Sequence, residues 1–226
     1  MAARSDSTGA TGVNPQTSSK HAREAAAWRR GPALQALRAA TDSRHAAIEA
    51  LLQLDSSTDR SRFAAALQVF EAFLRDWEPL AAQALPQRMR TWFEAHRRGH
   101  LATADVRRLG LAPLELGGLA TPTTASPAAA LGSAYVIEGS ALGGMVIARA
   151  MQDRFGIGRA NGATFFSARG GATVRIWREF CAQLESELAD DADAIGQACD
   201  GACLTFDLLA QAFREHLPAH AVGSVK

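Results

Sequence analysis

Apolar side chains recur at three-and-four spacing along most of this 226-residue chain, which is the spacing of helices with one buried face. The first such stripe, ending near Asp55, consists of Leu34, Leu37, Thr41, Ile48, Leu51 and Leu52. A second, capped by Thr58 or Asp59, consists of Phe63, Leu67, Phe70, Phe73, Leu74 and Trp77. No stretch alternates apolar and polar residues over a useful strand length. The sequence therefore predicts an all-α protein.

Proline and glycine divide this helical pattern into segments. Pro79 and Pro86 are expected to interrupt it, because proline lacks the amide hydrogen that a helix interior needs. Ser126 and Pro127 suit the start of a long helix. The predicted segments after Pro86 are a helix through Met89–Phe93, a loop over 110–127, a helix from Ser126 to about Phe155, a loop over 156–171, and helices over about 172–189 and 193–217.

Length and composition favour one folded domain over residues 31–220. Residues 1–30 lack apolar periodicity and are expected to be a disordered tail, with a short flexible end at 221–226. Hydrophobic residues make up 47% of the chain and charged residues 21%, as in globular proteins. The formal net charge of +1 argues against a nucleic-acid-binding protein, because phosphate neutralisation needs a strong basic excess.

The cysteines and the apolar runs indicate a cytoplasmic protein. Cys181, Cys199 and Cys203 are an odd number of cysteines in a chain without a signal peptide, so reduced thiols are expected. No apolar run approaches the roughly 20 residues that cross a bilayer, and no membrane association is expected.

A local group of arginines has two interpretations, a solvated helix surface or a docking surface for an acidic partner protein. Its members are Arg88, Arg90, Arg97, Arg98, Arg107 and Arg108.

The first predicted helix carries a histidine two turns after an arginine. Arg38 and His45 are seven residues apart, so they face nearly the same side and lie roughly 10 Å apart along the axis. An imidazole is a good iron ligand, and a guanidinium matches a carboxylate. Glu49, one turn beyond His45, is placed to orient the other ring nitrogen.

The long helix after Pro127 contains four glycines, Gly132, Gly139, Gly143 and Gly144. Each interior glycine costs about 1 kcal/mol relative to alanine, so their presence needs an explanation. Gly139 and Gly143 are one turn apart and would leave a groove without side chains, against which a flat ligand or another helix could lie.

Each of these features also has a purely structural explanation. His45 alone is more simply a buried core histidine, and the glycines alone allow close helix packing. A helical interaction protein without a cofactor is therefore one alternative. His96 and His100 face one way on a helix, but no Glu follows His96 and Gly99 interrupts the turn, which disfavours a metal site.

Together the two helices resemble the haem oxygenase family, most closely its bacterial branch. The first motif is Leu37-Arg38-x-Ala-Thr41-x-x-x-His45-x-x-x-Glu49, similar to the proximal helix of that family. The second is Tyr135-Val136-Ile137-Glu138-Gly139-Ser140-x-Leu142-Gly143, similar to the bacterial distal helix. The resemblance extends over roughly residues 32–217 and implies a single-domain helical bundle with haem between these two helices.

The resemblance also implies roles for individual residues. His45 corresponds to the iron ligand, Arg38 to a residue that meets a haem propionate, and Gly139 and Gly143 to the distal glycines over the haem. The remaining implied haem-pocket residues are Glu49, Tyr135, Arg178 after Trp177, and, more weakly, Arg175. Mammalian members carry an aspartate where this chain has Ser140, and a serine can hold a water but does not carry the same charge.

The activity that the resemblance implies is oxidative opening of haem to biliverdin, carbon monoxide and ferrous iron. Haem is then both cofactor and substrate, with O2 and an external reductant. The chain lacks a Gly-x-Gly-x-x-Gly motif, so a ferredoxin or reductase is expected to supply electrons. A phytochrome receiving biliverdin is a further expected partner. The alternative within the same fold is a haem carrier or sensor without turnover.

Overall fold

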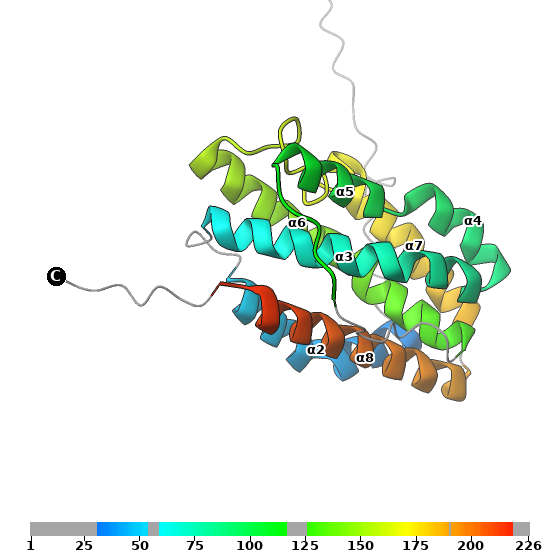
Figure 1. The fold of residues 1–226 in the computed structure, drawn as a ribbon. Coiled ribbons are helices and arrows are strands. Elements are labelled where there is room, and N and C mark those ends of the chain that lie inside the picture. The colour runs from blue at the N-terminus through cyan, green and yellow to red at the C-terminus, as the bar shows by residue number, and fades with distance from the viewer. Residues whose placement is uncertain (1–30, 54–58, 117–125, 190, 219–226) are drawn as a thin grey trace, which may run out of the picture.

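The computed structural model is helical throughout its regular segments (Figure 1). The structure describes residues 31–53, 59–116, 126–189 and 191–218, and no strand occurs among them. The prediction of an all-α fold is thus confirmed. The predicted tail at 1–30 and the predicted C-terminal end at 221–226 both lie outside the described residues. The helices are α2 (Pro32–Leu52), α3 (Arg60–Ala84), α4 (Gln87–His96), α5 (Gly99–Arg108), α6 (Pro127–Phe155), the short 3-10 helix η2 (Gly170–Ala172), α7 (Thr173–Leu188) and α8 (Ala192–His216).

The helix starts follow local capping chemistry, which is why the sequence predicted them well. Pro32 occupies the first turn of α2. The Asp59 carboxylate accepts a hydrogen bond from the Arg62 amide at 2.7 Å, and the Ser126 hydroxyl accepts one from the Ala129 amide at 3.1 Å. These bonds satisfy backbone donors that the first turn of a helix leaves without a partner.

The expected interruption at Pro79 is wrong, because α3 continues through this proline to Ala84. Trp77 and Ala81 on either side are both 0% exposed. Pro79 itself is exposed. The burial of the apolar face on both sides of the proline offsets the lost backbone hydrogen bond. The helix ends only before Pro86, which is the N-cap residue of α4.

The closest approach in the bundle is between α6 and α8, at two glycines that face the opposite backbone. A Cβ atom at Gly132 would lie 1.8 Å from the carbonyl oxygen of Ala198, and one at Gly201 would lie 2.2 Å from that of Ala129. Neither helix could come this near with a larger residue at these positions. Backbone packing therefore accounts for Gly132.

A chain of buried hydrogen bonds joins α3 to the same crossing. The Trp77 indole N–H donates to the Ser133 hydroxyl at 2.8 Å. The Thr205 hydroxyl lies 2.8 Å from the same oxygen and 2.7 Å from the Gly201 carbonyl. Because these polar groups satisfy one another, they can be buried without the cost of a lost hydrogen bond. The chain thus holds α3, α6 and α8 together.

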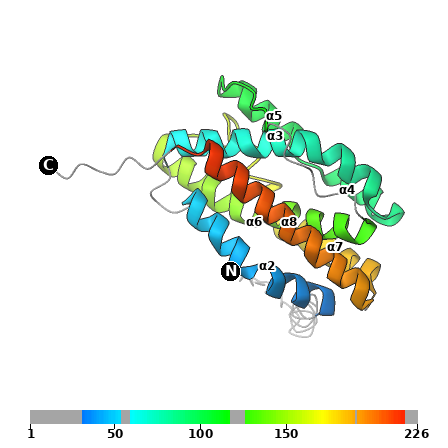
Figure 2. The same ribbon diagram turned by 60° about the horizontal axis from the view of Figure 1, so that its bottom comes forward.

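Helix α8 supports two helices that hardly touch each other. Figure 2 shows α8 crossing the bundle beside α2, with α6 behind it, and both helices pack extensively on α8. The N-terminus of α2 is also attached to α7, because the Glu185 carboxylate accepts hydrogen bonds from the Ala33 and Leu34 amides. Space for a ligand is therefore available between α2 and α6.

Helix α6 is long and apolar enough to cross a membrane, which corrects the expectation that no apolar run approaches that length. Its most apolar window has a mean hydropathy of 1.4, but 61% of that window is buried inside the bundle. The core helix of a globular bundle has the same composition. The burial of α6 explains its apolar character without a membrane.

Replacing Gly132 by alanine should destabilise the bundle. The added methyl group meets a backbone carbonyl, so α6 and α8 must separate, at a cost of about 1–3 kcal/mol in the free energy of unfolding. Gly196→Ala on α8 is the matched control, because a Cβ atom there meets nothing within 4 Å and should add up to about 1 kcal/mol. Urea unfolding of both variants measures the difference. Equal stability of the two would contradict the packing explanation.

Candidate functional site

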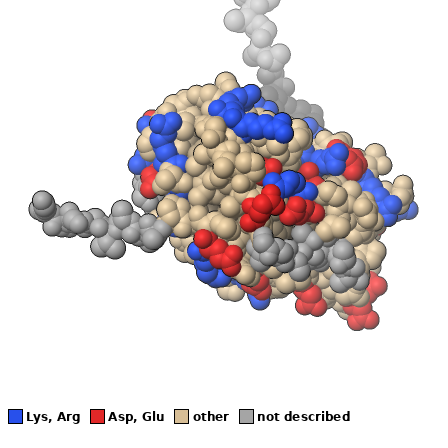
Figure 3. Space-filling view, viewed as in Figure 1, with Lys and Arg blue, Asp and Glu red and all other residues tan. Residues whose placement is uncertain are grey.

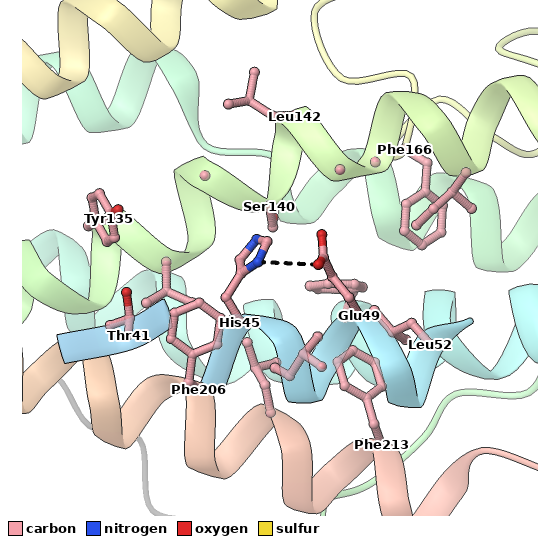
Figure 4. Close-up of a pocket in the computed structure, with 18 of the residues that line it drawn as sticks. Thr41, His45, Glu49, Leu52, Tyr135, Ser140, Leu142, Phe166, Phe206 and Phe213 are labelled. Carbon is pink, nitrogen blue, oxygen red and sulfur yellow. Dashed lines mark ion pairs between the residues drawn. The ribbon is translucent and has the colours of Figure 1, made fainter. Parts of the chain in front are cut away.

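A cavity of about 620 Å³ lies between α2 and α6. One wall is the stretch of α2 from Arg38 to Leu52, and the other is the stretch of α6 from Tyr135 to Ile147. Apolar side chains of α8 and the loop between α6 and α7 complete it. Figure 4 shows His45 on α2 and Ser140 on α6 facing the space between the two helices. Both motif helices of the sequence analysis therefore border one cavity.

His45 points into this cavity from α2 and is open to solvent, with 61% of its side chain exposed. Its Nδ1 atom lies 3.6 Å from a carboxylate oxygen of Glu49, which is longer than a hydrogen bond. The edge of the ring packs against Phe206 of α8, with 6.0 Å between the ring centroids. His45 is thus not the buried core histidine of the structural alternative. It is an accessible imidazole with a carboxylate nearby.

Arg38 and Tyr135 meet at one end of the cavity. Burial raises the pKa of Tyr135, while the charge of Arg38 and its hydrogen bond to Tyr135 oppose that rise. The Tyr135 ring also packs against Trp177 of α7, with centroids 5.4 Å apart. The structure therefore places the predicted pocket residues Arg38, His45 and Glu49 on one wall of the cavity and Tyr135 on the other.

The glycines of α6 separate into two kinds. Gly132 packs against α8, and a Cβ atom at Gly144 would lie 2.9 Å from the Phe166 carbonyl oxygen. At Gly139 the nearest atom would be in the Trp177 ring at 3.5 Å, an ordinary contact, and at Gly143 nothing lies within 4 Å. Packing explains the first pair. It does not require Gly139 or Gly143, and both of these border the cavity.

Ser140 borders the cavity between these two glycines. Its hydroxyl donates to the Ile137 carbonyl oxygen at 2.6 Å, within the same helix. It also accepts a hydrogen bond from the guanidinium of Arg98 at 3.0 Å. The hydroxyl is therefore held by two groups that do not themselves line the cavity.

The two predicted arginines of α7 do not border the cavity. Arg175 is exposed and forms an ion pair with Glu179 at 2.5 Å on its own helix. Arg178 is also exposed. Trp177 between them does line the cavity, so α7 contributes an aromatic side chain to the wall. Contact of Arg175 or Arg178 with a ligand remains a prediction.

Sequence reasoning missed the most unusual residue near the site, Arg98. It was grouped with the surface arginines, but it is only 3% exposed. The adjacent Arg97 is exposed and pairs with Glu94 at 3.2 Å. Nothing in the local sequence distinguishes these two neighbours. A buried arginine is identified only by the tertiary contacts that surround it.

The other arginines of that group remain exposed, but partners on the protein engage some of them. Arg90 donates to the Leu85 and Gln83 carbonyl oxygens, and Arg108 lies 3.8 Å from Asp105. Figure 3 shows basic side chains in several separate groups on this face, with acidic ones between them. The docking surface proposed from the sequence thus lacks Arg98 and is less uniformly basic than the sequence indicated.

The alternative metal site at His96 and His100 finds no support. The His96 ring stacks on Trp92, with centroids 4.4 Å apart, and its Nδ1 atom bonds the Trp92 carbonyl oxygen at 2.7 Å. His100 is exposed. Within the described parts of the chain, no group of three or more His, Cys, Asp or Glu side chains could hold a metal ion.

Part of the sequence and the overall fold are similar to those of known proteins. Residues 118–215 match the sequence model of the haem oxygenase family. The fold is similar to that of a haem oxygenase from Neisseria meningitidis solved with NO and CO bound, with 22% identity and a TM-score of 0.68, covering 83% of this chain and 92% of that one. No curated protein sequence matches the chain. Over residues 118–215 the chain is thus similar to the haem oxygenase family, as the motif from Tyr135 to Gly143 predicts, and the likeness in fold extends over most of the chain.

The similarity to this family supports haem binding and haem degradation in general. The cavity between α2 and α6 is the candidate haem site, since α6 lies within the matched residues and borders it.

Replacing Gly143 by leucine should fill the cavity without disturbing the fold. No atom lies within 4 Å of the Cβ position, and leucine favours a helix over glycine by up to about 1 kcal/mol. Urea unfolding should show equal or higher stability, while titration with hemin should show binding weakened by about tenfold or more.

Gly144→Ala is the matched control, because its methyl group meets the Phe166 carbonyl and should lower stability instead. Hemin binding by Gly143→Leu as tight as that of the unsubstituted protein would exclude Gly143 from the ligand site.

Proposed function

We propose that this protein is a haem oxygenase that binds haem between α2 and α6 and opens the ring to biliverdin, carbon monoxide and ferrous iron. The observation that carries this proposal is the pairing of an accessible imidazole, His45, with a helix surface that lacks side chains at Gly139 and Gly143. A neutral imidazole binds haem iron, and the open helix leaves room for a flat ring and a small gas.

The residues of the cavity fit haem in size and chemistry. Its volume of about 620 Å³ is within the range of roughly 300–1,000 Å³ that small-molecule sites occupy. Aromatic and aliphatic side chains such as Phe206, Leu209 and Phe213 make up much of the wall and suit the porphyrin ring. Arg38 at one end suits a propionate, because a guanidinium binds a carboxylate through two hydrogen bonds.

Bound haem supplies the iron that activates O2 and the ring that is oxidised. The protein supplies ligation and positioning. His45 is the proposed iron ligand, and Glu49 is the proposed carboxylate that orients its ring. Arg38 would anchor one edge of the haem, with Tyr135 beside it. Arg175 and Arg178 are proposed only for the outer edge, because they do not line the cavity.

On the α6 side, Gly139 and Gly143 would let the helix backbone lie close above the ring. Trp177 borders Gly139 and would limit the space on that side. The Ser140 hydroxyl is the proposed holder of a water in the distal pocket. Gly139, Ser140 and Gly143 are therefore the proposed catalytic residues of α6.

Electrons must come from outside the chain, and a ferredoxin or reductase is the proposed donor. The exposed arginines of α4 and α5 are the proposed dock for it, without Arg98. We further infer a cytoplasmic protein whose biliverdin product could pass to a phytochrome. A haem carrier or sensor of the same fold is the alternative. Adding ascorbate or a reductase to the haem complex separates these functions, since only an enzyme loses its Soret band and releases biliverdin.

His45→Ala should abolish the visible spectrum of a histidine-ligated haem and weaken hemin binding by about tenfold or more, because the proposed iron ligand is lost. Turnover to biliverdin should be lost as well. His100→Ala, on the exposed surface of α5, is the matched control and should bind and react normally. A spectrum that His45→Ala leaves unchanged would show that another residue binds the iron.

A further inference from the structure

A buried arginine that does not itself line the cavity bonds α6 beside it. Arg98 is the N-cap residue of α5 and is 3% exposed. One guanidinium nitrogen donates to the Ile137 carbonyl oxygen at 2.7 Å and to the Ser140 hydroxyl at 3.0 Å. Ser140 borders the cavity. Arg98 therefore connects the interior of the bundle to the wall of the candidate haem site through one hydroxyl.

The position of Arg98 is held by α3 and by the loop before α7. A carboxylate oxygen of Glu78 accepts hydrogen bonds from the Arg98 amide at 2.9 Å and the Gly99 amide at 2.7 Å. Burial raises the pKa of Glu78, and these two hydrogen bonds oppose the rise. The guanidinium of Arg98 lies over the Phe165 ring, 4.9 Å from its centroid. The arginine is thus held both at its backbone amide and at its guanidinium.

The charges around Arg98 come from three segments of the chain. Burial lowers its pKa, the neighbouring Glu138 on α6 raises it, Arg169 in the loop lowers it and Glu78 on α3 raises it. Glu138 and Arg169 form an ion pair at 3.0 Å. A guanidinium ordinarily stays protonated in proteins. Two buried or nearly buried cations therefore lie among two carboxylates beneath α6.

Stability alone does not explain this arginine. Its Nε atom is buried and has no hydrogen-bond partner among the residues that the structure describes. An unsatisfied buried donor is costly, and well-packed apolar residues often stabilise a core as much as buried ions do. The contact that Arg98 makes with the cavity wall at Ser140 offers a reason for its presence.

The hydrogen bonds of Ser140 determine what its hydroxyl can offer the cavity. A hydroxyl has one proton to donate and two lone pairs to accept with. The proton is used on the Ile137 carbonyl and one lone pair on Arg98. One lone pair remains. In this arrangement Ser140 can accept a hydrogen bond from a group in the cavity but cannot donate one to it.

We propose that Arg98 is a positioning residue that fixes the Ser140 hydroxyl as a hydrogen-bond acceptor toward the distal side of the haem pocket. Without Arg98 the hydroxyl loses one of the two hydrogen bonds that hold it, and the side chain can then change rotamer and donate into the cavity. With Arg98 in place, Ser140 holds a pocket water with that water's proton directed at the serine. This inference rests on the proposed haem site and adds to it the residue that sets the orientation of Ser140.

The ferric haem complex of the full chain provides the test, through the pH at which its visible spectrum changes from the acid to the alkaline form. An acceptor that binds a proton of the distal water favours the acid form. Ser140→Ala should therefore lower the midpoint by about 0.5 pH unit or more, a threefold or larger change in the proton equilibrium. Ser140→Thr, which keeps a hydroxyl, should shift it less.

Arg98→Lys keeps a buried cation but loses the planar guanidinium, so it should move the midpoint in the same direction as Ser140→Ala. In a double variant that combines Arg98→Lys with Ser140→Ala, the lysine should shift the pH midpoint no further than Ser140→Ala alone, because Arg98 acts through Ser140. Arg97→Lys is the matched control and should change nothing, since Arg97 is exposed and pairs with Glu94. If Arg98→Lys does not fold, the milder Glu78→Gln, which loosens the backbone at Arg98, must shift the midpoint the same way.

Two results would overturn the inference. In the first, Ser140→Ala shifts the pH midpoint, but neither Arg98→Lys nor Glu78→Gln does. The other is a pair of shifts that add in the double variant, which would mean that Arg98 acts independently of Ser140. Failure of the unsubstituted chain to bind hemin is a different result, because it would overturn the proposed haem site itself.

Discussion

The contact of the α6 backbone with the α8 backbone at Gly132 and Gly201 is the constraint on which the rest of the site depends. Each glycine lies against a carbonyl oxygen of the opposite helix, so the two helices cannot shift along each other without a clash or a gap. Helix α8 also supports α2. The two walls of the cavity are thus placed by a third helix, whose Phe206 and Phe213 line the cavity between them.

The four glycines of α6 show how one helix can serve stability and binding at different positions. Glycine lowers helix stability at every interior site by about 1 kcal/mol. At Gly132 and Gly144 the close packing of backbone on backbone offsets this cost. At Gly139 and Gly143 no such backbone contact exists, so no packing within the protein offsets the loss of helix stability. A core helix whose stability is lowered at positions without a packing reason is expected at a ligand site, because the bound ligand adds the stabilising contacts.

The features that the sequence predicted well are local ones. Capping at Asp59 and Ser126, the first turn at Pro32 and the common face of Arg38 and His45 all depend on residues within a few positions of each other. The wrong prediction at Pro79 and the missed burial of Arg98 both depend on distant parts of the chain. Arg98 bonds groups about 40 residues away, at Ile137 and Ser140, and no periodicity in its neighbourhood reports such contacts.

The buried charges beneath α6 also account for a serine at position 140, where mammalian members of the family that the chain resembles carry an aspartate. Glu78 and Glu138 already balance Arg98 and Arg169 in this region. A carboxylate at position 140 would add a third acidic group to this set, and desolvation makes an uncompensated charge expensive. A hydroxyl held by Arg98 supplies an acceptor toward the cavity without adding charge. The acceptor function and the charge balance are then properties of the same contact.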